Sequence, residues 1–229
     1  MHNLFLAKNP IIYSFITKFK KHINYEKLLY IRKIKQGDIV LDIGANQGYY
    51  TSLFSILIGQ YGQVHAFEPV PESFNKLRQL KSCYKNVILN NFAIGEKQGS
   101  ASINYDPMDS EKASLLNSRN TYPNEFITEV NSIDNYMIDK KLDKIDFIKC
   151  DVEGFELNAL KGAYESVTKF SPDISMEMTS NKQDTIELIN LLKKAGYNKF
   201  HKIEKGFPIF DIKTHNFIEE EYFYLYAIS

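Results

Sequence analysis

Ile39-Val40-Leu41-Asp42-Ile43-Gly44-Ala45-Asn46-Gln47-Gly48-Tyr49-Tyr50-Thr51 is the stretch that decides the fold of this chain. Its short apolar run ends in glycines, a pattern typical of a buried strand that turns sharply into a helix. Gly44 and Gly48 allow positive φ angles and let backbone N–H groups come close to a ligand. The helix that follows points its positive dipole end at the same place. The stretch therefore predicts a binding turn for a nucleotide-like cofactor.

The type of cofactor depends on the spacing within this turn. Neither the G-x-G-x-x-G fingerprint of dinucleotide-binding proteins nor the G-x-x-x-x-G-K phosphate loop is present. The turn instead reads G-x-N-x-G, in which Asn46 replaces a glycine, and Asn tolerates left-handed backbone geometry better than most residues. A second strand, Val64 to Phe67, is followed by Glu68, which lies 20 residues after Gly48. This is about the spacing at which an acidic residue binds the ribose hydroxyls of a nucleotide.

Length and composition favour one globular domain of ordinary charge. The chain has 229 residues, 44% of them hydrophobic, with 28 Lys and Arg against 28 Asp and Glu. This balance gives no reason to expect a nucleic-acid partner. Cys83 and Cys150 are the only cysteines, so we expect no disulfide framework and a cytoplasmic location. No apolar run approaches the roughly 20 residues of a transmembrane segment, and Met1 is expected to begin the chain without a secretion signal.

Residues 1–35 precede the cofactor turn and form an N-terminal helical extension to a domain at 36–229. Apolar residues between Ile12 and Ile23 recur at helical spacing, with lysines elsewhere on the turn, which predicts an amphipathic basic helix. Two interpretations remain open: the helix packs on the domain and covers the substrate cleft, or it contacts a membrane surface.

The rest of the chain alternates strand and helix patterns, which is typical of an α/β fold with a mostly parallel sheet. Residues 106–125 interrupt this alternation. They are polar and rich in turn-forming residues, so we expect a mobile loop that acts as a substrate lid. After them, residues 145–150 form a buried strand, a helix follows through about Val167, and Glu177 closes the next strand.

Carboxylates follow several of the predicted strands. Ligands of open parallel sheets bind at the carboxyl ends of the strands, so we expect Asp151, Glu153 and Glu177 to form a catalytic cluster. They have no obvious basic partner in the sequence. Asp151 has a competing interpretation as a helix cap and Glu177 as a buried ion-paired acid. Glu156 is expected on a solvated helix face.

Five segments of the chain resemble the FkbM family of S-adenosylmethionine-dependent methyltransferases. They are 42–51, Phe67-Glu68-Pro69, Asn91-Phe92-Ala93-Ile94-Gly95, residues 132–136 and Phe147-Ile148-Lys149-Cys150-Asp151-Val152-Glu153-Gly154-Phe155-Glu156. The resemblance implies a Rossmann-like class I methyltransferase fold, with a doubly wound seven-stranded sheet of order 3-2-1-4-5-7-6.

The resemblance also implies O-methylation of a hydroxyl on a sugar, a glycan or a small natural product. It places the methionyl part of the cofactor at Gly44 to Gly48, the ribose at Glu68, the adenine at the backbone around Ala93, and Asp151 at the reacting centre. The full set of expected cofactor contacts is Asp42, Gly44, Ala45, Asn46, Gly48, Thr51, Glu68, Pro69, Asn91, Ala93 and Asp151.

Several alternatives stay open at the level of sequence. A sugar hydroxyl is barely acidic, so a carboxylate or a metal must assist it, and Mg²⁺ is the expected ion if Asp151 and Glu177 both chelate. A Rossmann-type NAD(P)-dependent oxidoreductase is the competing enzyme, and a cofactor-binding partner subunit without catalysis is the competing non-enzyme. The sequence does not decide the acceptor, the metal requirement or the formation of a homo-oligomer.

Overall fold

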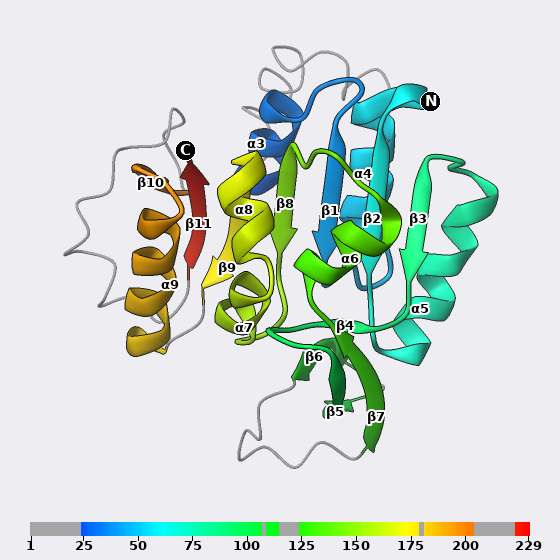
Figure 1. Ribbon diagram of the computed structural model, residues 1–229. Helices are drawn as coiled ribbons and strands as arrows, with labels where there is room; N and C mark the ends of the chain where they lie inside the picture. The colour runs from blue at the N-terminus through cyan, green and yellow to red at the C-terminus, as the bar shows by residue number, and fades with distance from the viewer. Residues whose placement is uncertain (1–23, 107–108, 115–123, 179–180, 204–222) are drawn as a thin grey trace.

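A computed structural model describes residues 24–106, 109–114, 124–178, 181–203 and 223–229. It has a central sheet with helices on both faces and a smaller sheet beyond one end of the central strands (Figure 1). This is the predicted α/β architecture. The smaller sheet was not predicted.

The central sheet is built from β1 (Ile39–Ile43), β2 (Gln63–Phe67), β3 (Val87–Asn90), β8 (Phe147–Cys150), β9 (Asp173–Met178), β10 (Lys199–Lys202) and β11 (Phe223–Ile228). The smaller sheet contains β4 (Ala93–Ile94), β5 (Gly99–Asp106), β6 (Asp109–Ser114) and β7 (Asn124–Asn131). The helices are α3 (Tyr25–Lys33), α4 (Tyr49–Ile58), α5 (Pro71–Arg78), α6 (Ile133–Lys140), α7 (Glu156–Lys161), α8 (Tyr164–Phe170) and α9 (Lys182–Lys194), with short 3₁₀ turns at Gly59–Tyr61 and Gln79–Ser82.

The order of the central sheet is β3-β2-β1-β8-β9-β11-β10. Counting only its own strands along the chain, this order is the predicted 3-2-1-4-5-7-6. All neighbours pair in parallel except β11, which is antiparallel to both β9 and β10. The parallel strands end beside one another, and Figure 1 shows the smaller sheet beyond these carboxyl ends. The seven-stranded fold is confirmed.

Two hydrophobic clusters occupy the two faces of the sheet. Successive strand residues point to opposite faces, so Val40 packs with α3 and α4 while Leu41 packs with α6 to α9. The same alternation separates Phe147 from Ile148 in β8. Lys149 lies two residues from Phe147 and therefore faces α3 and α4. This orientation turns its side chain toward Glu26 of α3 and Tyr50 of α4.

Residues 106–125 differ from the predicted mobile loop. Six of them form β6, which pairs antiparallel with β5, and β7 begins at Asn124. The polar composition of this segment is compatible with strands at the edge of a small sheet, so composition alone was misleading. The remaining parts, 107–108 and 115–123, lie outside the described residues.

One helix prediction is wrong in detail, and another concerns residues that the structure does not describe. The predicted single helix ending near Val167 is two helices, α7 and α8, separated by Gly162 and Ala163. The predicted amphipathic helix between Ile12 and Ile23 lies outside the described residues, and α3, which follows it, lies within the predicted helical extension at 1–35. Among the described helices, none has the length and apolar character needed to cross a membrane.

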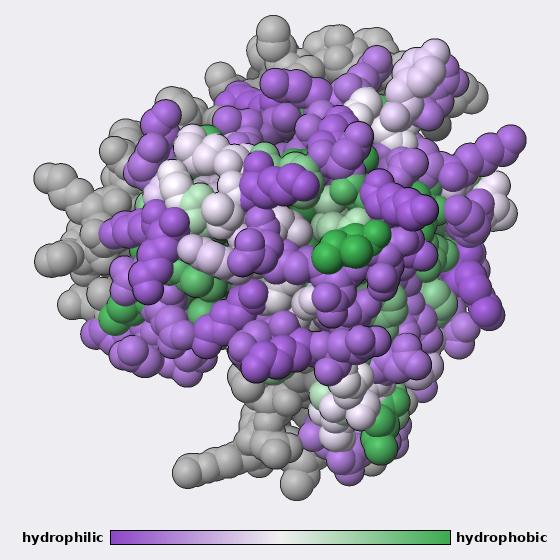
Figure 2. Space-filling view, in the orientation of Figure 1, coloured by the Kyte–Doolittle hydropathy of each residue, from purple (hydrophilic) through white to green (hydrophobic). Residues whose placement is uncertain are grey.

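The face shown in Figure 2 is mostly hydrophilic, as expected for the outer surface of helices that cover a sheet. A hydrophobic area interrupts it over α6, where Ile138 is 74% exposed. Single exposed apolar residues of this kind are normal on protein surfaces.

Candidate active site

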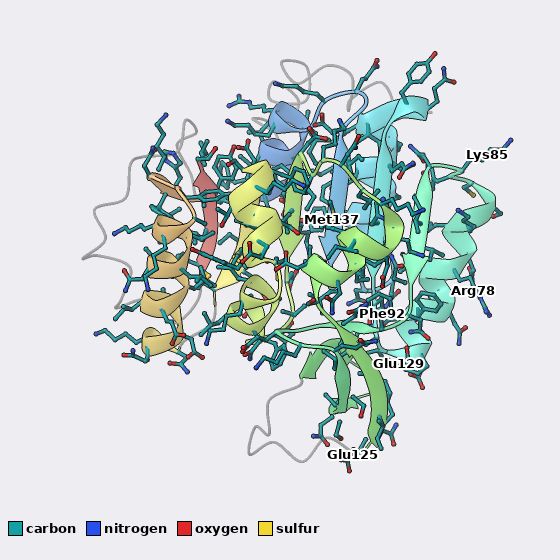
Figure 3. All side chains as sticks on the ribbon, viewed as in Figure 1. Arg78, Lys85, Phe92, Glu125, Glu129 and Met137 are labelled. Carbon is teal, nitrogen blue, oxygen red and sulfur yellow. The ribbon has the colours of Figure 1, made fainter. Side chains whose placement is uncertain are left out.

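A cavity of about 770 Å³ lies at the carboxyl ends of the parallel strands. Its size falls within the range of roughly 300–1,000 Å³ found for small-molecule sites. The glycine turn after β1 forms one wall, and the ends of β2, β8 and β9 contribute others. The smaller sheet closes the cavity with Ala93 and Ile94 of β4 and Ile103 of β5. Phe92, which Figure 3 labels between the central and the smaller sheet, also lines it.

The glycine turn has the left-handed geometry that its sequence predicts. Gly44, Asn46 and Gly48 have φ angles of 77°, 47° and 89°. A Cβ atom at Gly44 would lie 1.8 Å from the carbonyl oxygen of Asp151. Only glycine therefore lets the β1 turn pack directly against the end of β8.

We expect Gly44→Ala to abolish cofactor binding and to lower the free energy of unfolding by at least about 2 kcal/mol more than Gly37→Ala. Gly37 is a matched control, because its φ is 85° but a Cβ atom there would meet nothing within 4 Å. Both variants carry the strain of a positive φ, and only Gly44→Ala adds the clash with Asp151. Urea unfolding and calorimetry with S-adenosylhomocysteine measure the two effects. Equal losses in both variants would show that the close packing of Gly44 is unimportant.

Glu68 lies at the end of β2 and organises the turn that faces it. Its Oε2 accepts the Asn46 N–H and its Oε1 accepts the Val70 N–H, both at 2.8 Å. Burial raises its pKa to about 7, although these two hydrogen bonds oppose the shift. Glu68 lines the cavity, and each of its carboxylate oxygens retains a second lone pair. Glu68 thus has acceptor capacity for ligand hydroxyls once it is ionised.

Asp151 follows β8 and is paired with a lysine from the same strand. The Nζ atom of Lys149 lies 2.9 Å from Asp151 Oδ2. Burial opposes ionisation of Asp151, but the Lys149 charge and hydrogen bonds with Glu177 and Lys149 outweigh it, so its pKa is lowered. Asp151 is not a helix cap: the residue before α7 is Phe155, and it makes no side-chain capping bond. The capping interpretation is wrong.

Lys149 is the basic partner of these acids, and its role was not predicted from the sequence. It is 3% exposed and lies at the centre of three carboxylates, with Asp42 Oδ1 4.0 Å from its Nζ atom. Burial opposes its charge, but Asp151, Asp42 and Glu26 outweigh this effect and raise its pKa. The spacing in Lys149-Cys150-Asp151 could have predicted this ion pair, because side chains two residues apart at a strand end lie on the same side of the sheet.

Glu26 belongs to α3 and was not predicted as a site residue. Its carboxylate accepts hydrogen bonds from the phenol groups of Tyr30 and Tyr50, the latter at 2.5 Å. Tyr50 in turn places its ring 5.4 Å from Lys149 Nζ. Burial raises the pKa of Glu26. Helix α3 thereby brings the buried carboxylate of Glu26 to the wall of the cavity, where it meets Tyr50 of α4.

A tight turn after Asp151 presents Glu153 to the cavity. Glu153 has a φ of 54°, a conformation that is unusual for a residue other than glycine. Glu156 holds this turn, because its Oε1 accepts the N–H groups of Val152 and Gly154 at 3.0 and 3.1 Å. Glu156 is 4% exposed, so its predicted place on a solvated helix face is wrong.

Most of the predicted site residues meet at the cavity. Asp42, Gly44, Ala45, Asn46, Glu68, Pro69, Ala93, Asp151, Glu153 and Glu177 line it. The other three do not. Gly48 faces Leu77 and Leu80, Thr51 is buried and donates to Asp42 at 2.5 Å, and Asn91 donates to the backbone oxygens of Glu68 and Pro69. Their cofactor contacts stay predictions.

The cavity fits a cofactor that carries a positive charge. Asp42 is fully buried, and its Oδ1 has no hydrogen-bond partner among the described residues. Its other oxygen is taken by Thr51. The Lys149 ammonium lies 4.0 Å from Oδ1, which is too far for a hydrogen bond, and a ligand ammonium in the cavity would supply the missing hydrogen bond.

The residues of the cavity fit a metal ion less well than they fit a cationic cofactor. Carboxylate oxygens of Asp151, Glu153 and Glu177 lie within 4.8 Å of one another, and such oxygens are the ligands that Mg²⁺ prefers. However, the Lys149 ammonium already lies 2.9 Å from Asp151, so a metal would have to compete with a fixed cation. The residues present do not fit Mg²⁺ well, and no catalytic step is assigned to it.

Solved structures share the fold at low sequence identity. A "Methyltransferase FkbM" from Methylobacillus flagellatus KT is 15% identical, with a TM-score of 0.58 over 98% of this chain and 60% of that chain. A SAM-dependent O-methyltransferase from Thermotoga maritima is 12% identical, with a TM-score of 0.51 over 96% and 71% of the two chains. The fibrillarin of Aeropyrum pernix, solved with natively bound S-adenosyl-L-methionine, is 14% identical, with a TM-score of 0.51 over 86% and 68%.

The comparison by sequence gives the family. This chain spans about 60% of the length of the Methylobacillus protein. No curated protein matches the sequence significantly. The family model for the "Methyltransferase FkbM domain" matches residues 42–199, which include the glycine turn, Glu68 and the Lys149 to Glu156 segment. This match covers more than half of the sequence, and the chain therefore belongs to the FkbM methyltransferase family.

Proposed function

We propose that this protein is an S-adenosylmethionine-dependent O-methyltransferase that acts on a hydroxyl of a sugar, a glycan or a small natural product. The observation that supports this most is that the glycine turn, Glu68 and Asp151 line one cavity. Asp42, Gly44 to Asn46, Glu68 and the backbone near Ala93 would hold the cofactor. When bound, S-adenosylmethionine supplies a methyl group on a positively charged sulfur.

The residues of the cavity would mainly orient the acceptor. Alignment of reacting groups can supply roughly 7–11 kcal/mol of a barrier. Asp151 has a lowered pKa, so it is ionised at neutral pH and can accept a hydrogen bond from an acceptor hydroxyl. A strongly acidic carboxyl group is a weak base, which makes orientation its main task and removal of the proton secondary.

A hydroxyl-rich acceptor suits the groups around the reacting end. Asp151, Glu153 and Glu177 offer several oxygens that accept hydrogen bonds, and a sugar offers several hydroxyls that donate them. Tyr49 and Tyr50 add aromatic surface at the same cavity.

We also propose that residues 36–229 form the methyltransferase domain and that residues 1–35 are an extension of it. We propose that the protein works in the cytoplasm, where the free thiols of Cys83 and Cys150 remain reduced.

Two measurements test this proposal. Calorimetry should show micromolar binding of S-adenosylhomocysteine and no binding of NAD(H), which separates a methyltransferase from an oxidoreductase. Labelled S-adenosylmethionine incubated with a panel of sugars and oligosaccharides should then give labelled, base-stable ethers. Binding of NAD(H) in place of S-adenosylhomocysteine would overturn the proposal, and cofactor binding without transfer to any acceptor would favour the partner-subunit alternative.

A further inference from the structure

The charged groups that line the cavity are strongly unbalanced. Among the described residues, its carboxyl groups are those of Glu26, Asp42, Glu68, Asp151, Glu153 and Glu177, and its only cationic side chain is Lys149. Lys27 lies near the mouth, where its Nζ atom contacts the hydroxyl and ring of Tyr49, but it does not line the cavity.

The single cation cannot neutralise the surrounding acids. Lys149 already faces Asp151 at 2.9 Å and Asp42 at 4.0 Å, and it interacts with Glu26 through their charges. Asp42 Oδ1 is fully buried and has no hydrogen-bond partner among the described residues. Those of the remaining acids that are ionised favour positive charge on a ligand. On the acceptor side of the cavity, ionised carboxylates disfavour a second anionic group brought close to them.

We propose that this cavity selects its ligands by charge, favouring the cationic cofactor and an acceptor whose reacting end is neutral or carries an ammonium group over one with a carboxylate or phosphate. The inference rests on the proposed function and narrows its acceptor class to neutral or amino-bearing sugars and related compounds. Glu26 and Glu153 are the specificity-determining residues on the acceptor side. Glu26 comes from α3, outside the 42–199 family match, so it can set a specificity particular to this chain.

Cofactor analogues test the inference before the acceptor is known. In these analogues the transferable methyl group of S-adenosylmethionine is replaced by a carboxymethyl, a carbamoylmethyl or a 2-aminoethyl group. The first two have nearly the same shape and differ in charge and in the N–H donors of the amide, and all three place their terminal group where an acceptor approaches. Calorimetry in EDTA should show that the carboxymethyl analogue binds at least about tenfold more weakly than the other two.

Variants identify the residues responsible. Glu153→Gln and Glu26→Gln should each reduce the penalty on the carboxymethyl analogue by at least about threefold, because each replaces an acid that can carry negative charge by a neutral amide. Glu153→Gln keeps the test valid if Glu26→Gln does not fold. Glu96→Gln is the control, since Glu96 is half exposed and does not line the cavity. It should leave the penalty unchanged.

The outcomes separate this inference from the proposed function. If S-adenosylhomocysteine does not bind, the proposed function fails. If it binds but the carboxymethyl and carbamoylmethyl analogues bind equally well, charge selection is overturned and the methyltransferase assignment stands. Tighter binding of the carboxymethyl analogue on addition of magnesium chloride would also overturn the inference, in favour of a metal at Asp151, Glu153 and Glu177.

Discussion

Glu68→Ala is expected to weaken the binding of S-adenosylhomocysteine by at least about tenfold, because a carboxylate that accepts two ribose hydroxyls contributes about 1.5–3 kcal/mol for each charge-assisted hydrogen bond. The structure adds a second reason. Glu68 also accepts the N–H groups of Asn46 and Val70 at 2.8 Å, so its removal loosens the glycine turn itself. A moderate loss of stability is therefore expected beside the loss of affinity.

Calorimetry measures the affinity and thermal unfolding the stability. Glu165→Ala is the control, because Glu165 is an exposed carboxylate on α8 that does not line the cavity. It should bind S-adenosylhomocysteine as wild type does. Unchanged affinity in Glu68→Ala would remove Glu68 from the cofactor site.

The raised pKa of Glu68 also predicts that the affinity for S-adenosylhomocysteine depends on pH. Its pKa is about 7 in the free protein, so below pH 7 it holds a proton that must leave before both oxygens can accept ribose hydroxyls. Affinity should therefore rise by up to about tenfold between pH 6 and pH 8 and level off above that. Glu68→Gln has no proton to lose and should show a flat profile over this range. Equal wild-type affinity at both pH values would contradict this role.

The glycine turn could be predicted from the sequence because its signal is local. Gly44, Asn46 and Gly48 need left-handed backbone conformations, and the residue types that tolerate them are few. The sheet order came from resemblance and is confirmed by the pairing of the strands. Strands β6 and β7 were missed because they are largely polar, and polar composition predicts a loop as readily as an edge strand.

The partners of the acids were harder to predict, since they depend on contacts that are distant in sequence. Glu26 reaches the cavity only because α3 packs on the face of the sheet toward which Lys149 points. Glu156 continues a helical pattern that suggests a solvated residue, yet it binds the backbone of the turn before its own helix. Lys149 stands in an otherwise apolar strand, where a charged residue requires buried partners. That requirement, together with the two-residue spacing from Lys149 to Asp151, was the available signal for the pairing.

Asp151→Asn is expected to lower kcat by about 10²–10⁴ while changing the affinity for S-adenosylhomocysteine by less than about threefold. Asparagine keeps the shape of the side chain and removes the charge that would orient the acceptor hydroxyl. It also removes the closest partner of Lys149, which retains Asp42 and Glu26. Turnover is measured with the acceptor that the labelled-methyl assay identifies, and KM and kcat are determined separately.

The chain offers a matched control for the loss of an ion pair. Lys144 and Asp146 are two residues apart, as Lys149 and Asp151 are, but they precede the first residue of β8. The Nζ atom of Lys144 lies 2.8 Å from Asp146 Oδ2. Asp146 also accepts the Ile39 N–H at 2.7 Å, and it does not line the cavity. Asp146→Asn should therefore lower stability without lowering kcat. If the two variants lose activity in proportion to stability, Asp151 has a structural role only, whereas a loss of kcat confined to Asp151→Asn assigns it to the reacting centre.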